Sequence, residues 1–117
     1  MTENRGEMEE YDRNLRKSFG PIIMFDKDYA RAFMELEDQS YKEGALSIKT
    51  KRLMCVSISV ILHCKSCIAF HVKEAAKEGA TRKEIMESAL LAGTMGGGPA
   101  AAYIQFVIKA CDEFKIR

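Results

Sequence analysis

Three residues near the middle of the chain, Cys64, Cys67 and His71, have the types and the spacing that thiol redox chemistry requires. If a helix begins near Cys64, then Cys67 and His71 lie one turn apart on one face, close enough for a hydrogen bond. His71 can then take the proton of the thiol as a base. The N-terminus of a helix also favours a thiolate, because its partial positive charge and free N–H groups stabilise negative charge. The pattern therefore predicts a reactive Cys67.

The second cysteine completes a redox cycle. A thiol with a pKa of about 8.5 is only ~3% ionised at neutral pH, whereas a pKa near 7 leaves about half of it as thiolate. Cys64 is within reach of a sulfenic acid or mixed disulfide on Cys67, and its attack closes a disulfide that an external dithiol must reopen. Such a cycle transfers two electrons and needs no bound cofactor or metal.

Two other interpretations of the cysteine pair remain open. The pair could be two small buried hydrophobic residues, although the polar Lys65 and Ser66 between them indicate access to solvent. It could also belong to a zinc site, in which Cys64, Cys67 and His71 supply three ligands and His63 or Cys55 a fourth. Structural zinc in small domains more often uses two separated ligand pairs.

Glycine and proline divide the chain into helix-length blocks, and no block needs to be a strand. Asp26 is a candidate N-cap for an amphipathic helix that ends at Gly44. The apolar stretch 48–63 is too long and unbroken for a strand, so we expect a buried central helix there. Within this predicted amphipathic helix, residues of one face recur at three- and four-residue spacing: Tyr29, Phe33, Leu36 and Ser40.

The C-terminal third predicts two more helices. Gly79 is typical of a helix C-terminal cap, and Thr81 with Glu84 forms a capping box for the next helix. The run 96–98 predicts a sharp turn, and Pro99 suits the first position of a last helix that is apolar on most of its circumference. Four residues of the capping-box helix are expected to face inward: Ile85, Met86, Ala89 and Leu90.

These blocks predict one all-α domain of about six helices over residues 1–117, in which residues 1–20 pack loosely. The chain has 117 residues, is 47% apolar and carries a net charge of +1, so it should fold and lacks the positive field that binds nucleic acid or anionic membranes. The apolar run 53–62 is too short to span a bilayer, and the polar N-terminus does not resemble a secretory signal. We therefore expect a cytoplasmic protein, whose four cysteines do not form two structural bridges.

At the cysteine pair the sequence resembles the alkylhydroperoxidase D-like branch of the carboxymuconolactone decarboxylase superfamily. The likeness covers residues 26–114 and rests on four segments in order, which are Lys49-Thr50-Lys51, Cys64-x-x-Cys67-x-x-x-His71, Glu78-Gly79-Ala80-Thr81 with Glu84-Ile85, and Met95-Gly96-Gly97-Gly98-Pro99.

The resemblance implies a helical bundle that assembles into homotrimers or homohexamers. It also implies a peroxidase-type thiol oxidoreductase that reduces hydroperoxides or disulfides. Cys67 would attack, Cys64 would resolve and His71 would be the base, with electrons from a lipoamide- or thioredoxin-like dithiol. True carboxymuconolactone decarboxylases generally lack the cysteine pair, so lactone decarboxylation is a weaker alternative.

One position departs from the family pattern. The family's proton relay has a glutamate twelve residues before the first cysteine, where this chain has Arg52, and residues 48–63 contain no carboxylate. Arginine there could lower the pKa of the thiols while removing the proton shuttle, so disulfide exchange would survive better than peroxide reduction. The departure also keeps open a non-catalytic scaffold or binding protein. We interpret Cys55 and Cys111 as inert core cysteines. For His63 two roles stay open: tuning Cys64 or binding metal, and capping the C-terminus of the preceding helix.

Overall fold

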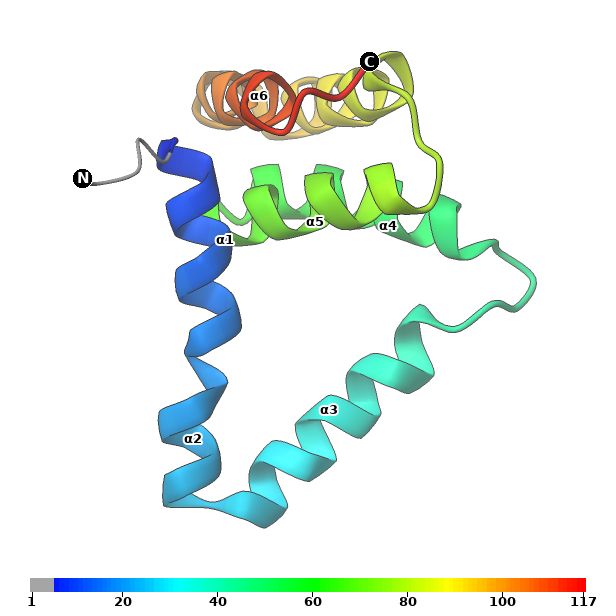
Figure 1. Ribbon diagram of the computed structural model, residues 1–117. Coiled ribbons are helices and arrows are strands. Elements are labelled where there is room, and N and C mark those ends of the chain that lie inside the picture. The colour runs from blue at the N-terminus through cyan, green and yellow to red at the C-terminus, as the bar shows by residue number, and fades with distance from the viewer. Residues whose placement is uncertain (1–5) are drawn as a thin grey trace.

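The computed structural model of the protein describes residues 6–117 and has six helices and no strand within that range (Figure 1). This confirms the predicted all-α fold. The helices are α1 (Glu7–Lys17), α2 (Phe19–Phe25), α3 (Lys27–Tyr41), α4 (Ile48–Ile61), α5 (Lys65–Lys77) and α6 (Arg82–Glu113).

The core lies where α4, α5 and α6 meet, with α1 packed across the end of this group (Figure 1). Each of the four helices contributes fully buried apolar side chains, including Met8 from α1, Val56 from α4, Ile68 from α5 and Val107 from α6. The stretch 48–63 forms a central helix as predicted. The polar side chain of Ser59 fits inside this helix because its Oγ donates a hydrogen bond to the carbonyl of Cys55 one turn earlier, at 2.6 Å. Within residues 6–117, no helix has both the length and the apolar character needed to cross a membrane.

Residues 1–20 were expected to pack loosely, and for α1 this expectation is wrong. Met8 is fully buried, and Asp12 is buried in ion pairs with Arg16 and Lys73 at 3.0 and 3.3 Å. The carboxylate of Glu113 accepts the N–H groups of Met8 and Glu9 at 2.9 and 3.0 Å, which satisfies the free end of the helix. Residues 1–5 lie outside the described range.

Helices α2 and α3 form an arm that leaves the body along the line of α1 and folds back toward the start of α4 (Figure 1). The predicted N-cap is confirmed, since Asp26 Oδ1 accepts the N–H of Tyr29 at 3.0 Å. The apolar side chains Tyr29, Phe33 and Leu36 are exposed, and only Ala30 of α3 is buried. The described chain therefore leaves this helix with little cover.

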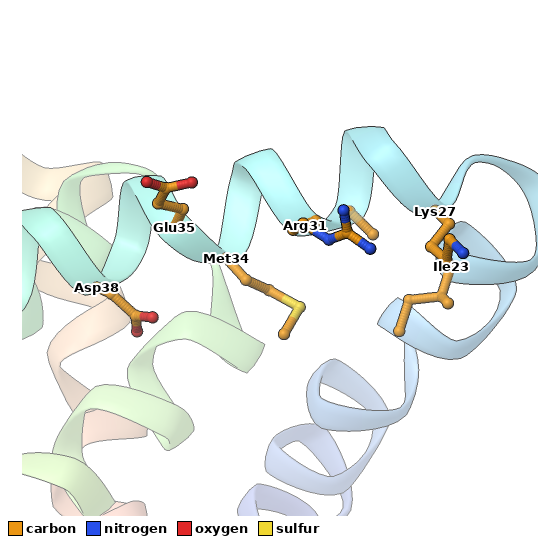
Figure 2. A pocket seen from close by; sticks show the side chains of 7 residues that line it. Ile23, Lys27, Arg31, Met34, Glu35 and Asp38 are labelled. Atoms are coloured by element: carbon orange, nitrogen blue, oxygen red, sulfur yellow. The ribbon is translucent and has the colours of Figure 1, made fainter.

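A hollow of about 350 Å³ lies where α2 and α3 diverge (Figure 2). Its lining is basic toward the start of α3, at Lys27 and Arg31, and acidic toward the end, at Glu35 and Asp38. It is lined by no cysteine or histidine of the described chain, so it lies apart from the predicted chemistry.

The predicted signals around α6 are confirmed at its start. Gly79 has a φ of +88°, a conformation that glycine adopts without strain, and Thr81 and Glu84 form the reciprocal capping box at 2.9 and 3.1 Å. Ile85 and Ala89 are buried as expected. Leu90 is 55% exposed, so its inward assignment is wrong; it follows Ala89 directly and is rotated off the buried face.

The glycine run divides α6 into two helical segments that meet at a kink. Gly97 has a φ of 73° and a ψ of −160°, a region that is open essentially only to glycine. Pro99 follows in the first turn after the break, where its missing N–H leaves no unpaired donor. The predicted sharp turn is therefore confirmed as a kink between the two helical segments of α6.

Candidate active site

The two cysteines of the motif sit at the N-terminal end of α5. His63 has a φ of 54°, a left-handed conformation that turns the chain from the end of α4 into α5. Cys64 is the N-cap residue, and its sulfur accepts the backbone N–H of Cys67 at 3.2 Å. The predicted helix start near Cys64 is thus confirmed, with Cys67 in the first turn.

Both thiols are free and partly buried, and this burial changes the expected ionisation. Burial raises the pKa of the Cys67 thiol to about 12, helped by its hydrogen bond with Cys64 and by the nearby sulfurs of Cys64 and Cys55. The expectation of a stabilised Cys67 thiolate is therefore not met in the dithiol state. The helix end acts instead on Cys64, whose sulfur accepts the backbone N–H of Cys67.

His71 lies one turn after Cys67 and is 8% exposed. Among the described residues its ring nitrogen bonds to Arg52 and not to Cys67, because the imidazole reaches toward α4: Arg52 Nη1 is 3.3 Å from His71 Nδ1. Burial, and then the charge of Arg52, lower the pKa of His71 to about 4, against the weaker opposing charge of Glu74. The ring is consequently neutral at pH 7.

Four groups fix the guanidinium of Arg52, which is only 13% exposed. It lies over the ring of Tyr41 at 4.0 Å and near that of Phe70 at 5.7 Å, and its Nη2 is 3.8 Å from a carboxylate oxygen of Glu74. With the contact to His71, these interactions hold the planar group in one orientation. Arg52 thus faces the histidine. Its charge was expected to lower the pKa of the CxxC thiols, but Arg52 is not among the groups that act on the pKa of Cys67.

Glu74 supplies the carboxylate that the segment 48–63 lacks. Its oxygens also pair with Arg16 at 3.2 Å and Lys77 at 3.1 Å. Burial alone would raise the pKa of Glu74, but the hydrogen bonds from Lys77 and Arg16 outweigh it and lower that pKa. One ionised carboxylate therefore sits among three cations, and Arg52 is the one that connects it to His71.

Sequence reasoning identified Cys64, Cys67, His71 and Arg52 but missed Tyr41 and Glu74. Glu74 follows His71 by three residues, so helical spacing alone could have placed both on one face. Tyr41 gave no such signal, since it ends a different helix and its ring meets that of His71 edge-on at 5.8 Å only through tertiary packing.

The remaining cysteines and histidine occupy different surroundings. Cys111 is fully buried, and burial raises its pKa to about 11, in keeping with an inert core residue. Cys55 is only partly buried; burial raises its pKa, while Arg52 and the Tyr41 hydroxyl beside it act in the opposite direction, so its surroundings are less apolar than expected. The exposed ring of His63 stacks on Tyr103 at 4.6 Å.

The zinc interpretation requires at least three ligands brought together. Within residues 6–117, no three histidine, cysteine, aspartate or glutamate side chains are grouped so that they could hold a metal ion. His71 is instead engaged by Arg52.

The sequence model of the carboxymuconolactone decarboxylase family matches residues 27–109, which include all of this site. The chain belongs to that family. A crystal structure of a carboxymuconolactone decarboxylase family protein from Legionella pneumophila superposes with a TM-score of 0.87 at 30% identity, covering 92% of this chain and 96% of that one. The resemblance and the helical fold expected from the sequence are thereby confirmed.

Two sequence relatives extend the comparison. Protein 4 of the cox locus of Paracoccus denitrificans is 38% identical over 82 residues, which are 70% of this chain and 74% of the relative. The alkyl hydroperoxide reductase AhpD of Corynebacterium kroppenstedtii is 28% identical over 78 residues, or 67% of this chain, but this match spans only 45% of the reductase. The family thus includes peroxidase-type and decarboxylase-type proteins, and this chain has similarity to the former.

Proposed function

We propose that this protein is a CxxC-dependent thiol–disulfide oxidoreductase that reduces hydroperoxides or disulfides. The observation that carries the proposal is the placement of both thiols at the start of α5, where the Cys64 sulfur accepts the Cys67 N–H at 3.2 Å. Two sulfurs held one turn apart at a helix N-terminus can exchange a disulfide with little movement of the backbone. The similarity to an alkyl hydroperoxide reductase supports the same chemistry.

The cycle follows the roles that the family resemblance gives. With a hydroperoxide, the Cys67 sulfur attacks the distal oxygen, the O–O bond breaks, and Cys67 becomes a sulfenic acid while an alcohol leaves. The Cys64 sulfur then attacks Cys67, water leaves, and a Cys64–Cys67 disulfide remains. With a disulfide substrate, thiolate attack releases one thiol and resolution of the mixed disulfide releases the other. His71 is the base in the family scheme.

The cycle closes when an external dithiol reduces the Cys64–Cys67 disulfide and itself becomes oxidised. A lipoamide- or thioredoxin-like dithiol fits this role, because an intramolecular dithiol closes its own disulfide and leaves both protein thiols free. Both protein thiols are partly exposed, as attack by such a partner requires.

The decisive test is turnover in the Cys67→Ser variant, measured with cumene hydroperoxide and with bis(2-hydroxyethyl) disulfide, each in the presence of dihydrolipoamide and corrected for the rate without protein. We expect turnover with both substrates to be lost. Cys111→Ala is the matched control, since it removes a buried thiol outside the site and should retain turnover. Wild-type rates in Cys67→Ser would refute the cycle.

A non-catalytic scaffold remains the rival class, favoured by Arg52 at the relay position and by the raised pKa of Cys67. The two classes differ in the labelling of Cys64 and Cys67 by iodoacetamide across a pH series, read by mass spectrometry. An oxidoreductase should show at least one of the two thiols labelling well below pH 8. Labelling of both only at alkaline pH, with no disulfide formed by oxidants, would support the scaffold.

A further inference from the structure

The contact between Arg52 and His71 determines which nitrogen of the imidazole can act. A guanidinium has five N–H donors and no acceptor, so in the 3.3 Å contact with Nη1 the Nδ1 atom must contribute its lone pair. In a neutral ring the other nitrogen, Nε2, then carries the proton. A carboxylate at this position would accept a proton from Nδ1 and leave the lone pair on Nε2.

We infer that Arg52 locks His71 in the Nε2–H tautomer, so that the free side of the ring is a hydrogen-bond donor and not a base, and the site acts on disulfides rather than hydroperoxides. The substrate class in this inference rests on the proposed function. Arg52 is a positioning residue in this scheme, because it acts through the imidazole.

The surroundings of the ring leave Nε2 as the atom available for chemistry. Arg52 approaches Nδ1 from α4, and the Tyr41 ring of α3 meets the imidazole edge-on at 5.8 Å. On α5 the charged neighbour is Glu74, which pairs with Arg52, and the neighbour one turn before is Cys67. Helical side chains lean toward the preceding turn, which on α5 carries Cys67. A base acting there would need a free lone pair, and the one lone pair of the ring is engaged at Nδ1.

The chemistry of the leaving group then separates the two substrate classes. Breaking the O–O bond of a hydroperoxide expels an oxygen anion, which needs a proton because the parent acid is very weak, with a pKa near 15.7 for water itself. Breaking an S–S bond expels a thiolate, whose parent thiol has a pKa of only about 8.5. A thiolate can leave without proton transfer, and a donated Nε2–H hydrogen bond is sufficient to stabilise it.

The position of Arg52 makes proton delivery by this ring unfavourable. To shuttle a proton, His71 must become an imidazolium, whose Nδ1–H would point at the guanidinium 3.3 Å away. That guanidinium is fixed between Tyr41 and Glu74 and cannot turn aside without losing both contacts. Sulfur exchange avoids the imidazolium, whereas peroxide reduction with His71 as shuttle requires it.

The tautomer can be read directly by nitrogen NMR of the reduced full-length protein at pH 7, labelled with ¹⁵N. The two ring nitrogens differ widely in chemical shift when one is protonated, and only two histidines contribute signals, so a His63→Gln variant assigns them. We expect a protonated Nε2 in wild-type His71 and a scalar coupling across the hydrogen bond from Arg52 to Nδ1. A proton on Nδ1 would overturn the inference, whether or not the protein turns over any substrate.

Three substitutions of Arg52 test the cause. Arg52→Glu should move the proton to Nδ1, whereas Arg52→Lys, which can still donate, should retain the Nε2–H form. If Arg52→Glu fails to fold, Arg52→Met provides the reading: without the donor at residue 52, the Nδ1–H form of His71 should become populated. An Arg52→Glu or Arg52→Met protein in which His71 keeps the wild-type Nε2–H tautomer contradicts the assignment.

Substrate choice is measured in the same variants as the ratio of hydroperoxide to disulfide turnover, with cumene hydroperoxide and bis(2-hydroxyethyl) disulfide, each corrected for the rate without protein. General acid–base assistance is worth 10²–10⁴-fold, so Arg52→Glu should raise the ratio by at least about tenfold, and Arg52→Lys should leave it low. A wild-type enzyme that prefers the hydroperoxide overturns the substrate assignment. Turnover of neither substrate would count against the proposed function, and the tautomer would still be decided by its own signals.

Discussion

The imidazole of His71 links the protonation of one side chain to the stability of the fold. Burial and the Arg52 charge lower the pKa of His71 to about 4, whereas an unfolded histidine titrates near 6.5. Between these values the unfolded chain binds a proton that the folded protein does not, so this contribution to stability is complete above pH 6.5 and is lost as the pH falls toward 4.

We therefore expect the unfolding free energy to fall by about 3 kcal/mol between pH 7 and pH 4 because of His71. Urea unfolding at a series of pH values measures this fall, and the plot of unfolding free energy against pH should have a shallower slope in His71→Gln. The carboxylates titrate in both proteins, so the difference between the two slopes isolates the ring. His63→Gln is the control, because that ring is exposed and should leave the wild-type slope intact. Equal slopes in His71→Gln and wild type would show that the ring is not held neutral.

At the scale of single residues, the sequence identifies a functional side chain when the residues that indicate it lie close together in the chain. Cys64, Cys67 and His71 lie within eight consecutive residues, and one helix places them. The ionisation of Cys67 could not be foreseen, because it depends on how deeply the packed helices bury the sulfur. Nor could the partner of His71 be foreseen, since Arg52 lies 19 residues away and reaches it only across the contact of α4 with α5.

Among the helices, the break inside α6 is the element whose conformation depends most on one residue. Gly97 adopts a φ of 73° with a ψ of −160°, which a side chain makes unfavourable even though an added Cβ would meet nothing within 4 Å. The penalty is thus one of backbone conformation and not of space.

Gly97→Ala should accordingly lower the unfolding free energy by about 1–3 kcal/mol, measured by chemical denaturation. Gly98→Ala is a matched control, because an added Cβ there also meets nothing within 4 Å and the backbone φ of Gly98 is not positive. That variant should change stability by less than about 1 kcal/mol. Equal losses in the two variants would mean that the kink does not depend on the left-handed glycine.

Helix boundaries were predictable where the capping chemistry is local. Asp26, Gly79 and the Thr81–Glu84 box each act within three or four residues of the helix end, and each performs the expected role. The packing of α1 was not predictable, because its cap is the carboxylate of Glu113.

At the scale of the whole molecule, residues 6–117 expose apolar surface on two faces. One follows α3. The other is a groove of about 500 Å³ between α4 and α6, whose lining includes Met54, Ile58, Leu91 and Met95. Of these, Met95 is 87% exposed. Monomers rarely leave contiguous apolar surface of this kind in water.

Taken with the family resemblance, these faces lead us to propose that copies of the chain cover them in a homotrimer or homohexamer. Light scattering coupled to size exclusion should give three or six times the 13.2 kDa chain mass. Leu91→Glu should shift the population toward monomer, since a charge would have to be buried in the groove. Gln105→Glu, an exposed polar position on the same helix, should retain the assembly. A monomer at micromolar concentration in the wild type would contradict this assembly.

The capping of α1 by Glu113 has a consequence for synthesis. The donors at Met8 and Glu9 lie in the first described helix, and their acceptor is 105 and 104 residues later in the sequence. Until the last turn of α6 has emerged, the first helix lacks this cap. The start of α1 therefore completes its native hydrogen bonds only after residue 113 has been synthesised.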